Sequence, residues 1–132
     1  MAVSRRAALA ALATVPAAAV AQPVQAAVPA TSTGPMYGLI GKMRAKPGQR
    51  DALIDLLVAG TAAMPGCLSY VIAKDSLDAD ALWVTEVWDS AASHKASLAL
   101  PAVRAAISQG RPMIAGIGER FETQPVAGVR PA

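Results

Sequence analysis

Hydrophobic and polar residues alternate along four short stretches of the chain, and this period of two predicts β-strands. The stretches are residues 37–45, 67–75, 81–89 and 117–123. In the third stretch apolar residues occupy both faces, with Leu82, Val84 and Trp88 on one and Ala81, Trp83 and Val87 on the other. In the fourth, we expect Ile117, Glu119, Phe121 and Thr123 to share one side.

Between the strands, apolar residues recur at helical spacing. Residues 49–64 carry leucines three and four positions apart, and the pattern stops at Pro65. Residues 89–100 predict a short second helix, and Pro101 suits the first turn of a further helical segment that runs to Gly110.

The predicted order of elements is β-α-β-β-α-β. Right-handed crossovers then place the helices on one face of a four-stranded antiparallel sheet, which is the ferredoxin-like α+β fold. The other face keeps apolar residues that the chain's own helices do not cover. We therefore expect a homodimer packed through the open sheet face, the alternative being a monomer with a poorly covered sheet.

The first 26 residues differ in composition from the rest. Arg5 and Arg6 precede an Ala/Leu/Val run, and small residues precede possible cleavage points after Ala21 and Ala26. The run is short and is interrupted by Pro16, so it predicts a removable twin-arginine export signal and no integral membrane span. We expect an exported protein, periplasmic or secreted, although a disordered Ala/Pro tail would have a similar composition.

The segments beside the predicted domain are rich in turn-forming residues. Residues 27–35 predict a flexible linker, and residues 125–132 predict an irregular tail. The whole chain has 12 Lys and Arg against 9 Asp and Glu, a net charge of +3, and the two arginines of the predicted signal account for most of it. Because no basic cluster with interleaved aromatic residues remains, nucleic acid is not an expected partner.

Cys67 is the only cysteine, so an intramolecular disulfide is excluded. No group of Cys and His has zinc spacing, and we predict no metal site. A small buried hydrophobic role suits Cys67 best, with an intermolecular disulfide or a reactive thiol as the alternatives. The chain also lacks a phosphate-binding loop, a dinucleotide fingerprint and a nucleophile elbow. Any reaction would depend on a pocket, a proton acceptor and orientation.

His94 is the only histidine and the first candidate for a proton acceptor. The predicted helix begins near Asp89, which places His94 close to a helix N-terminus, where imidazolium is disfavoured and the neutral base is favoured. A solvated histidine without a role is the alternative. Glu86 shares a strand face with apolar neighbours and therefore needs a partner. A structural salt bridge would satisfy it, as would a role in orienting His94 or a substrate hydroxyl.

Four aromatic residues complete the candidate chemistry. Trp83 and Trp88 lie on opposite strand faces, and we interpret them as core and dimer anchors in preference to stacking platforms. Tyr37 and Tyr70 could each place a hydroxyl in a cavity, although tyrosines at strand ends also pack as amphipathic side chains.

Two motifs stand out in the predicted domain: PGCLSY at residues 65–70 and EVWDSAASH at residues 86–94. Both resemble motifs of the antibiotic biosynthesis monooxygenase family. Together with Pro47-Gly48 before the first helix and the β-α-β-β-α-β order, the similarity spans residues 36–123. It predicts one family domain at residues 36–124.

The resemblance implies a dimeric α+β barrel and a cofactor-independent monooxygenase that oxidises small electron-rich aromatic or quinol substrates with O₂. In that chemistry a base deprotonates a hydroxyl, the anion gives an electron to O₂, and an apolar pocket excludes water. It makes His94 the candidate base or orienting group, beside Glu86 at the strand end. Trp88, Tyr70 and Tyr37 are the candidate substrate-binding residues.

Other functions within this resemblance remain open. Some family members bind and degrade haem with a His ligand, an Asn and a Trp; here the first strand, residues 37–43, has no Asn. A non-catalytic module that binds a hydrophobic ligand or serves in a stress response is another possibility. So is a dimeric accessory subunit in which only the fold matters.

Overall fold

The computed structural model describes residues 34–128. Its elements, in chain order, are β1 (Tyr37–Ala45), α1 (Arg50–Gly60), β2 (Cys67–Lys74), β3 (Ala81–Trp88), α2 (Ala91–Ser97), α3 (Pro101–Gly110), the 3₁₀ turn η1 (Arg111–Met113) and β4 (Ile114–Thr123). The predicted signal at residues 1–26 and the linker up to residue 33 lie outside the described residues. Within residues 34–128, no helix combines the length and apolar character needed to cross a membrane.

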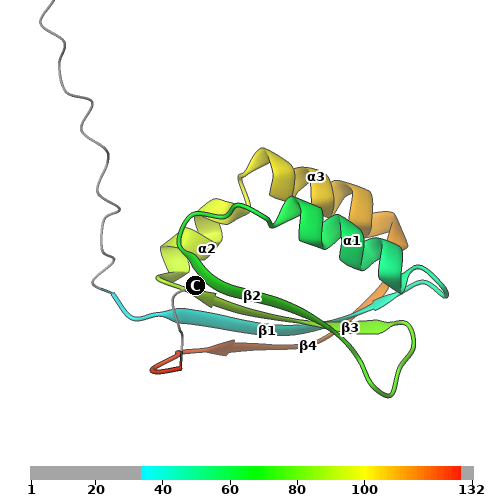
Figure 1. Cartoon of the computed structure of the whole chain (residues 1–132), viewed down its shortest axis with the longest axis horizontal. Coiled ribbons are helices and arrows are strands. Elements are labelled where there is room, and N and C mark those ends of the chain that lie inside the picture. Colours follow the sequence, from blue (N-terminus) through cyan, green and yellow to red (C-terminus); the bar gives the residue numbers. More distant parts are fainter. Residues whose placement is uncertain (1–33, 129–132) are drawn as a thin grey trace, which may run out of the picture. The chain divides into compact units, whose positions relative to one another are not determined.

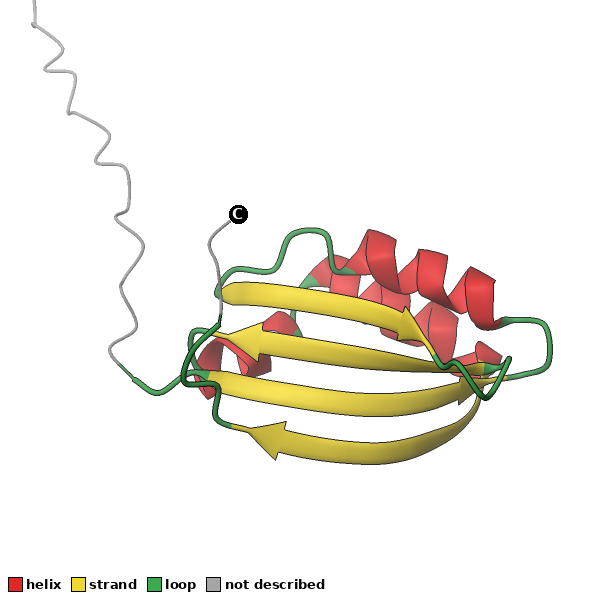
Figure 2. Ribbon diagram, turned by 60° about the horizontal axis from the view of Figure 1, so that its bottom comes forward, coloured by secondary structure: helices red, strands yellow, loops and turns green. Residues whose placement is uncertain are grey.

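The four strands form one antiparallel sheet in the order β2-β3-β1-β4. All of the described helices lie on the same side of this sheet, and no element within residues 34–128 covers the opposite side (Figures 1 and 2). This arrangement confirms the ferredoxin-like α+β fold predicted from the element order.

Several predicted boundaries were wrong. The first helix ends at Gly60 instead of continuing to residue 64; Thr61 caps it, with its backbone N–H and its hydroxyl both donating to the carbonyl of Leu57, at 3.0 and 2.7 Å. The predicted second helix, residues 89–100, is only seven residues long as α2. The last strand begins at Ile114, three residues before the predicted start.

The core lies between the sheet and the helices. Leu53 of α1 and Leu82 of β3 are completely buried, and Val84 and Ala45 pack in the same cluster. Burial of a leucine side chain stabilises the fold by about 1.5 to 3 kcal/mol. Trp88, at the end of β3, is 1% exposed, which confirms its predicted core role.

A bulge in β4 changes which side chains share a face. Gly41 pairs with Arg120, whereas Met43, two residues later, pairs with Ile117, three residues earlier, so β4 has one extra residue opposite Lys42. Ile117 therefore lies on the helix side and Phe121 on the open side. The prediction that these two residues share a face was wrong, because period-two counting does not anticipate a bulge.

The open face presents a row of side chains that crosses all four strands. Register pairs join Val71 to Thr85, Thr85 to Ile40, and Ile40 to Phe121. Val71 and Phe121 are each more than half exposed. The sheet thus has an exposed, largely apolar surface opposite its helices.

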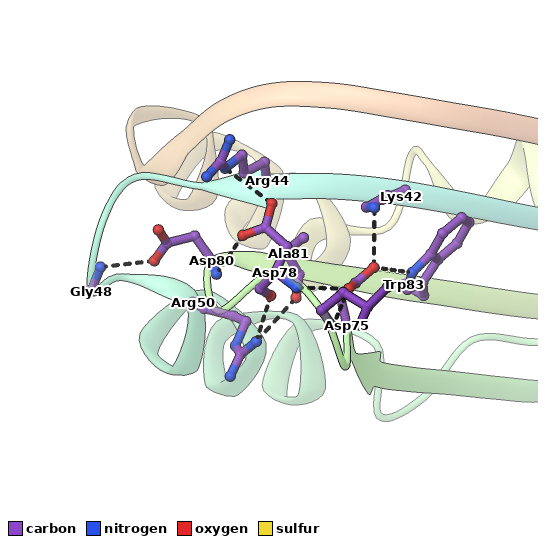
Figure 3. A network of polar contacts seen from close by, with 10 residues as sticks. Lys42, Arg44, Gly48, Arg50, Asp75, Asp78, Asp80, Ala81 and Trp83 are labelled. Atoms are coloured by element: carbon purple, nitrogen blue, oxygen red, sulfur yellow. Dashed lines mark hydrogen bonds and ion pairs between the residues drawn. The ribbon is translucent and has the colours of Figure 1, made fainter.

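A polar network closes the β2–β3 hairpin at one end of the sheet (Figure 3). The carboxylate of Asp75 accepts hydrogen bonds from Trp83 Nε1 at 2.8 Å and from the backbone N–H of Leu77 at 2.8 Å, and it pairs with Lys42 Nζ at 3.0 Å. These donors, the backbone N–H of Leu77 first among them, lower the pKa of Asp75. Arg50 of α1 donates to the carbonyl of Asp78, which ties the hairpin turn to the first helix.

Candidate functional site

The junction between β3 and α2 fixes the position of the only histidine. Ser90 caps α2 by accepting the backbone N–H of Ser93 at 3.1 Å. The backbone N–H of Asp89 donates to the carbonyl of Gly66 at 2.9 Å. Gly66 has a φ of +82°, and a Cβ at this position would lie 2.6 Å from Cβ of Ser93. Only glycine permits this close approach of the turn to α2.

His94 is largely buried at this junction. Its side chain is 15% exposed, so the alternative of a solvated surface histidine was wrong. The ring of Tyr37 lies over it, with 5.0 Å between centroids, and the indole of Trp88 meets it edge-on at 5.4 Å. Since α2 has only seven residues, His94 lies in its last turn as well as near its start. His94 therefore does not occupy the N-terminal end of a longer helix, where the helix dipole would favour a neutral ring.

Glu86 has the partners that its position requires. Its side chain is 12% exposed, and Oε2 accepts a hydrogen bond from Trp88 Nε1 at 2.8 Å. The same Oε2 lies 3.7 Å from Nε2 of His94. The carboxylate is therefore held from two sides by groups that the sequence motif contains.

Glu86 also lines a hollow of about 180 Å³ on the helix side of the sheet. Every lining residue belongs to a strand: Leu39, Gly41, Lys42, Met43, Tyr70, Val84, Glu86, Ile117, Glu119 and Arg120. We call it the ring hollow. His94 is not among the lining residues, so it stands behind Glu86 and reaches the ring hollow through that carboxylate.

The two tyrosines of the predicted site line different hollows. Tyr70 pairs with Glu86 across β2 and β3 and lines the ring hollow. Burial, and then the charge of Glu86, raise the pKa of Tyr70, so its hydroxyl stays protonated at neutral pH. The hydroxyl of Tyr37 instead donates a hydrogen bond to Oε1 of Glu122 at 3.0 Å, and Tyr37 lines a different hollow. Its contact with the predicted site is the packing of its ring on His94.

A second, larger hollow adjoins the first. It has a volume of about 360 Å³ and lies between α1, α3, β1 and β4, where Leu53, Leu57 and Ile107 line it. Both hollows share Met43 and Ile117, which are register partners on neighbouring strands. Sequence analysis missed the contribution of β4 to both hollows, because the bulge decides that Ile117 points toward the helices.

The donors present give little support for a metal or haem site. Among residues 34–128, no three His, Cys, Asp or Glu side chains are grouped to hold a metal ion. Nε2 of His94 faces Glu86, and aromatic rings pack against the imidazole, so the residues do not fit an axial haem ligand. Cys67 is partly buried, and burial raises the pKa of its thiol, which agrees with the predicted packing role.

The family model for antibiotic biosynthesis monooxygenase matches residues 36–109. The chain belongs to this family. A crystal structure from Chloroflexus aurantiacus J-10-fl that bears the same family designation is 68% identical. It aligns with a TM-score of 0.69 over 70% of this chain and 95% of that chain. No functionally curated protein matches the sequence.

More distant members share the fold. A Caulobacter crescentus structure with the family designation is 22% identical, with a TM-score of 0.62 over 70% of this chain and 92% of that chain. A Deinococcus radiodurans structure with the same designation is 24% identical, with a TM-score of 0.59 over 71% and 96%. At these identities the likeness concerns the fold alone. The family places this chain among monooxygenase-like proteins.

Proposed function

We propose that this protein is a cofactor-independent monooxygenase that oxidises small electron-rich aromatic or quinol substrates with O₂. The observation that carries the proposal is the Glu86 carboxylate at the wall of the ring hollow, with Nε2 of His94 3.7 Å behind it. In such a pair the carboxylate can accept a proton from the substrate, and the neighbouring imidazole can share that proton.

The proposed reaction needs only a few groups from the protein. The Glu86–His94 pair takes a proton from a substrate hydroxyl, and the resulting anion donates an electron to O₂. Recombination at the ring and loss of water give a hydroxyquinone. A benzene-1,4-diol and O₂ thus yield the hydroxyquinone and one water, with one oxygen atom entering the ring and the substrate supplying all four electrons. Apolar walls such as Leu39 and Val84 exclude water from the intermediates.

The test is oxygen uptake with a panel of substituted hydroquinones, using protein purified without flavin or added metal. We expect His94→Ala to lower kcat/KM at least tenfold, about 1.4 kcal/mol of transition-state stabilisation. With ¹⁸O₂, one labelled atom should appear in the product and the other in water.

Lys95→Ala is the matched control, because Lys95 follows His94 on α2 and its side chain is exposed. This variant should keep the wild-type rate. Unchanged oxygen uptake in His94→Ala would remove His94 from the mechanism. No uptake by the wild-type protein with any hydroquinone would reject the monooxygenase proposal.

The larger apolar hollow favours a second candidate function, the non-catalytic binding of a hydrophobic ligand. Leu53, Leu57 and Ile107 line a volume of about 360 Å³, which suits an apolar molecule without requiring any chemistry. This function predicts that the ligand protects the protein against unfolding and that no O₂ is consumed. Thermal unfolding and oxygen uptake measured on the same samples separate the two functions.

The expected assembly and location are part of the same proposal. We propose a homodimer formed through the open sheet face, supported by the exposed apolar residues Val71 and Phe121. We also propose that residues 1–26 direct export, supported by Arg5 and Arg6 before the apolar run. Replacing both arginines with lysine should retain the protein in the cytoplasm, as measured by cell fractionation.

A further inference from the structure

Gly41 lies in the middle of β1, where glycine is not required by the backbone. Its φ lies outside the left-handed region, and a Cβ built on it meets no atom within 4 Å. Glycine in a strand interior usually weakens the strand or marks a close approach of another group. Here no protein atom makes that approach, so the space above Gly41 belongs to the ring hollow, which Gly41 lines.

The position of Gly41 makes it the floor of that hollow. It shares a strand face with Leu39 and Met43, which also line the hollow on either side of it. Its register partners are Val84 on β3 and Arg120 on β4. Glu86 pairs with Leu39, one step along the same face, so its carboxylate stands beside the empty space.

We propose that Gly41 is a specificity-determining residue that forms the seat for a single aromatic ring, whose hydroxyl faces Glu86. The choice of a hydroxylated ring rests on the proposed function. The volume supports a single ring: an apolar cavity of about 150 Å³ can hold benzene, and the ring hollow measures about 180 Å³. Any side chain at residue 41 would occupy this space.

Substitution at Gly41 should therefore affect binding and leave the fold intact. Valine suits an extended strand, and its Cβ meets no neighbour at this position. Its two methyl groups would project into the volume that the ring occupies. We expect the melting temperature of Gly41→Val to equal or exceed that of the wild-type protein, while ring binding is lost.

Gly116 provides the matched control. It also lies in a strand of the same sheet, and a Cβ there also meets nothing within 4 Å. Its backbone borders the larger apolar hollow and not the ring hollow, and its register partner Arg44 lies on the open face, so a side chain at residue 116 would point away from both hollows. Gly116→Val therefore makes the same chemical change in the same sheet without filling the proposed seat.

The experiment is anaerobic calorimetric titration of hydroquinone into the full-length wild-type protein, Gly41→Ala, Gly41→Val and Gly116→Val. We expect Kd to rise slightly with alanine and at least tenfold with valine at residue 41, and to stay unchanged in Gly116→Val. Equal Kd values for wild type and Gly41→Val would overturn the inference. Equal increases in Kd for Gly41→Val and Gly116→Val would also overturn it, as would the absence of hydroquinone binding by the wild-type protein.

Because the titration excludes oxygen, it is independent of turnover. Position-dependent binding without any oxygen uptake in air would support the ring seat and reject the monooxygenase proposal. If Gly41→Val changes neither oxygen uptake nor the Kd for hydroquinone, the monooxygenase proposal is supported and the role of Gly41 in ring binding is rejected.

Discussion

Trp88 donates its indole N–H to Oε2 of Glu86 at 2.8 Å, and the two residues lie two positions apart on the same face of β3. Trp88 is 1% exposed, so the orientation of its ring is fixed by packing. The hydrogen bond fixes Oε2 in turn. No hydrogen bond to Oε1 is found among the described residues, and under the proposed function we assign the contact with the substrate hydroxyl to this oxygen. A core tryptophan therefore also positions the candidate base.

Replacing Trp88 with phenylalanine should destabilise the protein by at least about 1.5 to 3 kcal/mol, the usual loss for a hydrogen bond to a charged group, because the smaller ring also leaves a cavity in the core. Urea unfolding measures this change. Trp83→Phe is the control, because Trp83 makes an equivalent 2.8 Å bond to Asp75 on the opposite face. Both variants should lose stability, but only Trp88→Phe should also lower kcat/KM for hydroquinone. Equal activity in the two variants would contradict a positioning role for Trp88.

Glu86→Gln keeps the shape of the side chain and removes its ability to accept a proton. We expect kcat/KM for oxygen uptake to fall at least tenfold, because the neutral amide cannot deprotonate the substrate hydroxyl. Glu119→Gln is the comparison, since Glu119 is an exposed carboxylate that lines the same hollow. A similar fall in both variants would indicate a general effect of negative charge and argue against Glu86 as the base.

Asp75 should make the protein sensitive to acid. Its folded-state pKa lies below the ordinary value of 3.8, chiefly because the backbone N–H of Leu77 and the indole of Trp83 donate to the carboxylate. Its contribution to stability is complete above pH 3.8 and is lost as the pH falls toward the folded-state pKa. Asp75→Asn should lower stability at pH 7 and flatten the dependence below pH 4. Asp55 lies on the exposed side of α1, so Asp55→Asn should change neither the stability at pH 7 nor the dependence of stability on pH below pH 4.

Phe121→Asp should disrupt the proposed dimer. Phe121 is 54% exposed in the row of apolar residues on the open face, and a carboxylate there would be buried without a partner in a sheet-to-sheet interface. Light scattering coupled to size-exclusion chromatography should give a dimer for the wild type and a monomer for the variant. Leu77→Asp is the control, because Leu77 is 97% exposed on the β2–β3 turn, away from the sheet face. A wild-type monomer would reject the dimer.

The fold could be predicted from the sequence because its signals are local. Alternation along the strands, leucine spacing in α1 and the Pro-Gly turn at residues 65–66 each depend on neighbouring residues. The order of these elements then leaves few topologies. Element ends were less accurate: α1 ends at Gly60 and not at residue 64, which the spacing of its leucines does not reveal.

The site was predictable only in part. Glu86, Trp88 and His94 could be placed near one strand–helix junction from their spacing, since all three lie within nine residues. Chain folding adds that His94 is largely buried next to Glu86, that Tyr70 lines the ring hollow and Tyr37 does not, and that Gly41 also lines it. These relations depend on register between strands distant in sequence and on a bulge in β4, and neither leaves a local pattern along the chain.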